Sequence, residues 1–308
     1  MKKKLIAILA LATIAACNKA DVVESNPGEA IAFDDAFVGN ATKATDPSYG
    51  THNSLTSFNV WGTVSSTTDA PVAIFANDPV TGTVGENSVW SCTSKTQYWI
   101  ADAKYNFAAL VDAGNVTLGA DLLPAKVAFE SNGSTDLLYA KSEEYTGKVS
   151  GNDLVAFDFA HLLSKIYLKV TNNSTGAAGY SFLMKDIKIN GLKTAATYYI
   201  QADGEHAAGT WTATAGDYTF DNITVAAGAA SAECDAEQLI IPGAITVSFN
   251  LDILYNGSTL STKPYTYSTS IEAGKAYRIN VTASVGEEIK FTVSENPSWD
   301  TTKPEISL

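Results

Sequence analysis

The sequence contains few of the residues on which most catalytic and binding sites depend. Its 308 residues include one arginine, Arg278, together with three histidines and three cysteines. A single guanidinium excludes sites in which several Arg side chains clamp phosphates or carboxylates. The net charge of -13 also argues against a nucleic-acid partner, because binding to the phosphate backbone requires clustered Lys and Arg.

Motifs for catalysis and metal binding are also lacking. The histidines lie far apart, at His52, His161 and His206. None has a spacing typical of zinc ligands, and no P-loop, Rossmann or G-x-S-x-G pattern occurs. The adjacent carboxylates Glu143-Glu144 and Glu287-Glu288 would point to opposite faces of a strand, which does not suit a paired acid and base. We therefore predict no enzyme activity, no cofactor and no metal site.

The first residues have the pattern of an export signal. Lys2 to Lys4 precede an apolar run from Leu5 to Ile14, and Ala15-Ala16 then leads to Cys17. The run is too short for a membrane span, and its small-small-Cys ending resembles a bacterial lipobox. We predict a signal peptide over residues 1–16 and lipid on Cys17, which would anchor the chain to a membrane. The alternative is an ordinary secreted protein that is cut nearby.

Residues 17–43 are predicted to contain a tether and an N-terminal strand. The tether is rich in small and acidic residues, but Ile31, Phe33 and Phe37 recur at even spacing. This period of two is typical of a strand with one apolar face.

The rest of the chain is predicted to be all-β. From about Ser54 onward, short runs rich in Val, Ile, Thr, Tyr and Phe alternate with turn residues, and no long helix is predicted. Three Asn-Gly pairs favour tight hairpins, at Asn132-Gly133, Asn190-Gly191 and Asn256-Gly257. The polar stretch from Val170 to Tyr180 lacks apolar periodicity, so we place a domain boundary there. We expect one β-sandwich over residues 44–174 and a second over 175–308.

Several segments, taken together and in order, resemble the fimbrillin superfamily, the FimA- and Mfa-like subunits of type V pili. They are the lipobox, TKATD (42–46), FNVWGTV (58–64), residues 89–111, DLLYAKS (136–142), VAFDFAHLLSKIYLKVTN (155–172) and residues 271–300. The resemblance covers essentially the whole chain. It implies two tandem transthyretin-like β-sandwich domains and an outer-membrane lipoprotein precursor that ends in a cell-surface pilus.

The resemblance also implies a route of assembly. In that family a trypsin-like protease removes the lipidated N-terminal strand, and a strand from a neighbouring pilin subunit fills the groove. By analogy the cut would follow Lys43, where the family usually has Arg, and the excised strand would contain Ile31, Phe33 and Phe37. The donor is expected near the C-terminus, where Ile289, Phe291 and Val293 alternate. The short tail beyond Val293 favours a tip or accessory subunit over a stalk subunit.

Two further questions stay open from the sequence. Cys92 and Cys234 are a candidate disulfide in an oxidising compartment, but they fall in different predicted domains, and two unpaired thiols are the alternative. A second hypothesis for function is a permanently anchored surface lipoprotein that binds a glycan or a host protein, since the chain has five Trp and fourteen Tyr. A secreted glycosidase ranks far behind both.

Overall fold

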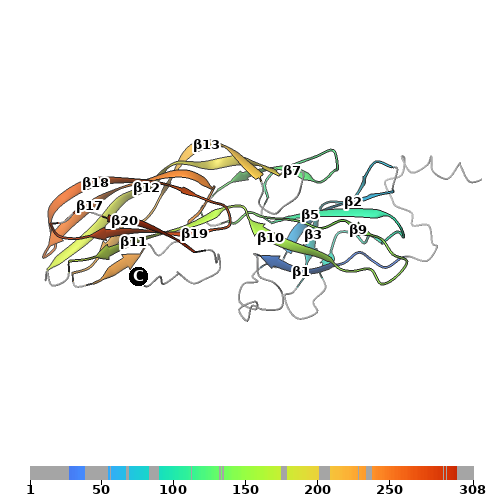
Figure 1. Cartoon of the computed structure of the whole chain (residues 1–308), viewed down its shortest axis with the longest axis horizontal. Coiled ribbons are helices and arrows are strands. Elements are labelled where there is room, and N and C mark those ends of the chain that lie inside the picture. The colour runs from blue at the N-terminus through green and yellow to red at the C-terminus, as the bar shows by residue number, and fades with distance from the viewer. Residues whose placement is uncertain are drawn as a thin grey trace, which may run out of the picture.

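The computed structural model confirms that the chain is all-β (Figure 1). It describes residues 28–38, 55, 57–66, 69–82, 90–111, 113–131, 133, 135–174, 179–200, 209–227, 229–233, 238–286, 288 and 290–296. Within these ranges no helix occurs, and therefore none that is long and apolar enough to cross a membrane. The strands form three sheets.

The first sheet has eight strands in the order β1-β10-β8-β5-β2-β3-β4, and β9 pairs with β5. Their bounds are β1 Phe33–Val38, β2 Ser57–Ser65, β3 Val72–Thr81, β4 Ser91–Cys92, β5 Lys104–Val111, β8 Leu138–Lys141, β9 Tyr145–Thr146 and β10 Val155–His161. Alternate residues of β10 are buried, namely Val155, Phe157 and Phe159. They join an aromatic core with Phe58, Phe75, Trp90 and Phe107.

The second and third sheets face each other across a separate core. The second has β11 Ser164–Asn172, β15 Ser231–Glu233, β16 Gln238–Ile240, β19 Ala276–Ala283 and β20 Lys290–Asn296. The third has β6 Val116–Leu118, β7 Pro124–Glu130, β12 Tyr180–Ile200, β13 Gly209–Thr219, β14 Ile223–Val225, β17 Gly243–Tyr255 and β18 Ser258–Ile271. Their core contains Ile166 and Leu168 of β11, and Val247 and Phe249 of β17.

One long strand and a third core join these parts. β12 is 21 residues long and pairs with β17 along its first half and with β7 along its second half. Around β7 and the end of β12, Val127 and Tyr198 belong to the same buried cluster as Trp61 and Leu110 of the first sheet. Figure 1 shows the result as an elongated molecule with the first sheet at one end and the β17–β18 hairpin at the other.

The chain passes between sheets earlier than the boundary predicted at residue 174. Leu162 and Leu163 separate β10 of the first sheet from β11, and β11 pairs in parallel with β19 from Lys165 to Asn172. Residues 164–172 therefore belong to the second sheet, because their apolar side chains complete its core. The division into two transthyretin-like domains stays a prediction.

Candidate functional site

The N-terminal strand closes the first sheet. Residues 28–33 approach the segment 90–99, and β1 pairs in parallel with β10. On one side, the amides of Ile31 and Phe33 donate to the carbonyls of Gln97 and Trp90, at 2.8 and 2.9 Å. On the other side, the amide of Val155 donates to the Ala32 carbonyl at 2.9 Å. The strand thus bridges β10, at one end of the sheet order, and the segment that contains β4, at the other end.

The side chains of this strand fill the first core. Ile31 is 5% exposed and Phe33 is fully buried. Phe33 lies centrally among aromatic rings, with centroid distances of 5.7 to 6.2 Å to Phe58, Phe75, Phe107 and Phe157. If the strand were removed, these rings would be exposed along a groove whose backbone groups would also lose their partners.

A bulge alters the expected alternation within β1. Phe33 is the register partner of Val155, but Ala36 and Val38 are the partners of Phe157 and Phe159. The extra residue between Phe33 and Ala36 shifts the pattern by one, as β-bulges do. Phe37 is therefore the register partner of Asp158, and its role in filling the groove stays a prediction.

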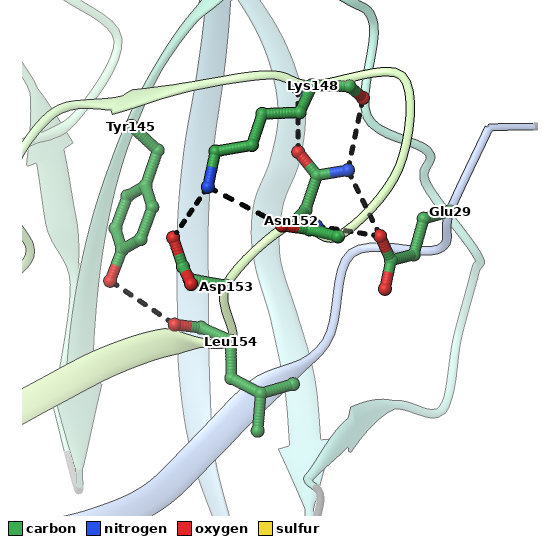
Figure 2. Close-up of polar contacts among 7 residues, drawn as sticks. Glu29, Tyr145, Lys148, Asn152, Asp153 and Leu154 are labelled. Carbon is green, nitrogen blue, oxygen red and sulfur yellow. Dashed lines mark hydrogen bonds and ion pairs between the residues drawn. The ribbon is translucent and has the colours of Figure 1, made fainter.

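Close contacts fix where the strand enters the sheet. A Cβ on Gly28 would lie 2.5 Å from the carbonyl oxygen of Trp99, so this position requires glycine unless the backbone shifts. One residue later, Oε2 of Glu29 accepts hydrogen bonds from the backbone amide and from Nδ2 of Asn152, at 2.8 and 3.2 Å (Figure 2). The two Asn152 donors hold the pKa of Glu29 below its ordinary value of 4.5.

The loop that carries Asn152 is held by its own contacts. Oδ1 of Asn152 accepts from the amide of Lys148 at 2.7 Å, and Nδ2 donates to the Lys148 carbonyl at 3.1 Å. Lys148 also pairs with Asp153 at 3.1 Å (Figure 2). Nearby, Tyr145 accepts from the amide of Ala156 at 3.0 Å and so connects the loop end to β10. Contacts within the loop therefore help to hold the Asn152 donors toward Glu29. We call Gly147 to Leu154 the clasp loop.

The expected C-terminal strand is an edge strand of the second sheet. β20 pairs only with β19 among the described strands. Phe291 and Val293 are half-buried, and the Phe291 ring stacks on Tyr267 of β18 with centroids 5.2 Å apart. Ile289 lies outside the described residues. Its role and that of β20 as a donor stay predictions.

Several predicted residues are not described. Cys17, Lys43 and Cys234 lie outside the described ranges, so lipidation, cleavage and the Cys92–Cys234 pairing stay predictions. Cys92 lies on β4 and is half-buried. Across the described part of the chain, no three His, Cys, Asp or Glu side chains are grouped in a way that could hold a metal ion.

Sequence reasoning missed the contact between Glu29 and Asn152. These residues are 123 positions apart, and neither belongs to a recognisable motif. The one available signal was Pro27-Gly28 directly before an acidic residue and an alternating strand. This pattern indicates where a strand begins, but it does not indicate which residue contacts Glu29.

Comparison with known proteins identifies the family. The model of the fimbrillin-like family matches residues 42–297. The chain belongs to this family. The match begins after β1, which therefore precedes the matched region. A search of curated proteins found no match.

Two solved structures with a similar fold come from Bacteroides species. A fimbrial protein from Bacteroides vulgatus has 17% identity and a TM-score of 0.58, and the alignment covers 87% of this chain and 99% of that one. A candidate cell adhesion protein from Bacteroides ovatus has 18% identity and a TM-score of 0.56, with 90% and 99% covered. At these identities the likeness establishes a common fold.

Proposed function

We propose that the protein is a structural subunit or a tip or accessory adhesin of a bacterial type V pilus. It is exported as an outer-membrane lipoprotein through Cys17, cleaved after Lys43, and joined to other pilin subunits by strand exchange on the cell surface. Membership of the fimbrillin-like family supports the pilus or adhesion role. The structure of residues 28–38 supports the route of assembly.

The observation that carries the proposal is the position of β1. A strand that is hydrogen-bonded on both sides and that inserts a fully buried Phe33 belongs to the fold of the first sheet. If cleavage lets β1 leave, two rows of backbone groups and an apolar groove are exposed, and another strand can both pair with these groups and cover the groove. Backbone bonds would then give affinity to the replacement strand, and alternate side chains would set its register.

Limited proteolysis of the folded precursor tests the proposal. We expect a low dose of trypsin to cut first after Lys43 and to yield oligomers that survive detergent. The Lys43→Ala variant is the matched control and should stay intact and monomeric under the same conditions. A cut protein that keeps its N-terminal strand and stays monomeric would contradict assembly by exchange. That result would favour the permanently anchored lipoprotein that binds a glycan or a host protein.

A further inference from the structure

The groove that holds residues 28–33 constrains the type of residue at four of these six positions. Gly28 lies against the Trp99 carbonyl, and Glu29 binds the clasp loop through Asn152. Ile31 and Phe33 enter the core. Ala30, just before Ile31, is exposed, and Ala32, between Ile31 and Phe33, is half-buried, so these two positions tolerate other side chains. The groove therefore fits the sequence Gly-Glu-x-Ile-x-Phe.

The same sequence occurs once more in the chain. Residues 286–291 read Gly-Glu-Glu-Ile-Lys-Phe, and residues 28–33 read Gly-Glu-Ala-Ile-Ala-Phe. The four positions that the groove contacts specifically are identical, and the two differences fall at the positions of Ala30 and Ala32. Glu288 would take the exposed position, and the long side chain of Lys290 can extend from the half-buried one to solvent.

The second segment is also placed where it could leave its own sheet. It leads directly into β20, which makes one ladder, to β19, and is an edge of the second sheet among the described strands. Detachment would break that ladder, the contacts of the Phe291 ring with Phe249, Tyr265 and Tyr267, and the packing of β20 on the core. Binding in the groove would compensate for these losses. The segment would form new backbone hydrogen bonds there, and Phe291 would take the fully buried position of Phe33.

We infer that the clasp loop and the groove form a recognition site for a Gly-Glu-x-Ile-x-Phe strand, and that residues 286–291 of a second copy of this chain are its occupant. Glu287 would then take the place of Glu29 on Asn152, and Ile289 and Phe291 would take the places of Ile31 and Phe33. This inference rests on the proposed strand exchange and adds to it the partner and the register. A chain that accepts and donates the same sequence can polymerise with itself, as a stalk subunit must.

Peptide exchange on the full chain tests this inference. A recognition sequence for a specific protease is inserted after Lys43 and cut, so that the N-terminal segment stays in place without a covalent link. Fluorescent peptides of residues 28–38 and 286–296 are added, and their binding is followed by anisotropy. Both peptides are expected to displace the native segment.

Substituted peptides then show which side chains are recognised. Glu29→Ala and Glu287→Ala are expected to weaken binding about 5-fold, since each loses a charge-assisted hydrogen bond. Phe33→Ala and Phe291→Ala should weaken binding on the order of 100-fold, because each leaves a cavity in the core. Glu288→Ala is the matched control, a neighbouring carboxylate at the exposed position, and it should bind like its parent. When the cut chain carries Asn152→Ala, the 5-fold difference in affinity between the parent peptides and their Glu29→Ala or Glu287→Ala forms should be smaller.

The outcomes separate the inference from the proposed function. If the 28–38 peptide exchanges but the 286–296 peptide does not, this chain is not its own donor, and strand exchange with another subunit stands. If Glu287→Ala and Glu288→Ala weaken binding equally, the clasp loop does not select the carboxylate. If neither peptide exchanges while the cut chain stays folded, strand exchange and this inference are rejected together.

Discussion

Phe33 and Phe157 stack face to face across the parallel pairing of β1 and β10, with ring centroids 6.0 Å apart and an interplanar angle of 14°. One ring comes from a segment that precedes the family match and the other from within it. The first core is therefore completed by residues that the proposed assembly would remove and replace.

Phe33→Ala is expected to destabilise the precursor by about 3–5 kcal/mol, because it removes a fully buried ring and leaves a cavity among its neighbours. Urea unfolding monitored by tryptophan fluorescence measures the change. Ile100→Ala, at a residue that is 60% exposed, is the control and should alter stability by less than about 0.5 kcal/mol. Equal effects of the two substitutions would mean that β1 adds nothing to the core.

Gly28→Ala should weaken the binding of the N-terminal strand in its groove, since the new Cβ would lie 2.5 Å from the Trp99 carbonyl oxygen. We expect a net cost of about 1 kcal/mol or more, after the smaller gain from a less flexible unfolded chain. The dissociation rate of the N-terminal segment from the cut chain measures this cost. Ala30→Ser, at an exposed position, should leave that rate unchanged. A Gly28→Ala rate equal to wild type would show that the entrance adapts freely.

The contact between Glu29 and Asn152 should depend on pH in a defined direction. The folded-state pKa of Glu29 is lowered, so its contribution to stability is present above the ordinary value of 4.5 and is lost as pH falls through the folded-state value. Urea midpoints of wild type and Glu29→Gln should differ at pH 7 and converge in acid. In an Asn152→Ala background the difference at pH 7 should be smaller. A difference that persists in acid would assign the effect to another cause.

Asp252 on β17 is buried and should stabilise the third sheet through its ion pair with the half-buried Lys185 of β12. Burial alone would raise its pKa, but hydrogen bonds from Lys185 and Thr262, both 2.6 Å long, outweigh burial and hold the pKa below 3.8. Asp252→Asn is expected to cost about 1–3 kcal/mol at pH 7. The cost should shrink as pH falls through the lowered pKa, because wild-type Asp252 then becomes neutral as well.

The control for Asp252 is Asp186→Asn on β12. Asp186 also accepts a side-chain hydrogen bond, from Asn250 at 2.9 Å, but this contact is exposed. Its substitution should change the free energy of unfolding by less than about 0.5 kcal/mol. If both variants lose the same stability at pH 7, burial of the Asp252 pair is not the cause.

The sequence predicted local patterns well where one face of a strand is buried. Alternation identified Ile31 and Phe33 as core residues, and Asn256-Gly257 forms the expected hairpin turn, with both φ angles positive. Prediction from the sequence failed where pairing between distant segments determines the structure. Asn190-Gly191 lies inside β12 and not in a hairpin, because β12 pairs continuously with strands from distant parts of the chain.

The entrance to the groove was beyond sequence reasoning for the same reason. The clasp loop meets Glu29 only once the sheet has closed, and the need for glycine at residue 28 comes from the Trp99 carbonyl. The bulge before Ala36 is set by pairing with β10, so the spacing of Phe37 alone did not reveal it. Each of these features depends on contacts between segments far apart in the chain.

Native mass spectrometry during cleavage after Lys43 tests the central claim most directly. We predict that one N-terminal fragment, from the lipidation site to Lys43, is released for each new subunit-to-subunit contact that forms. Full cleavage in which every fragment stays bound and the protein stays monomeric would contradict the account.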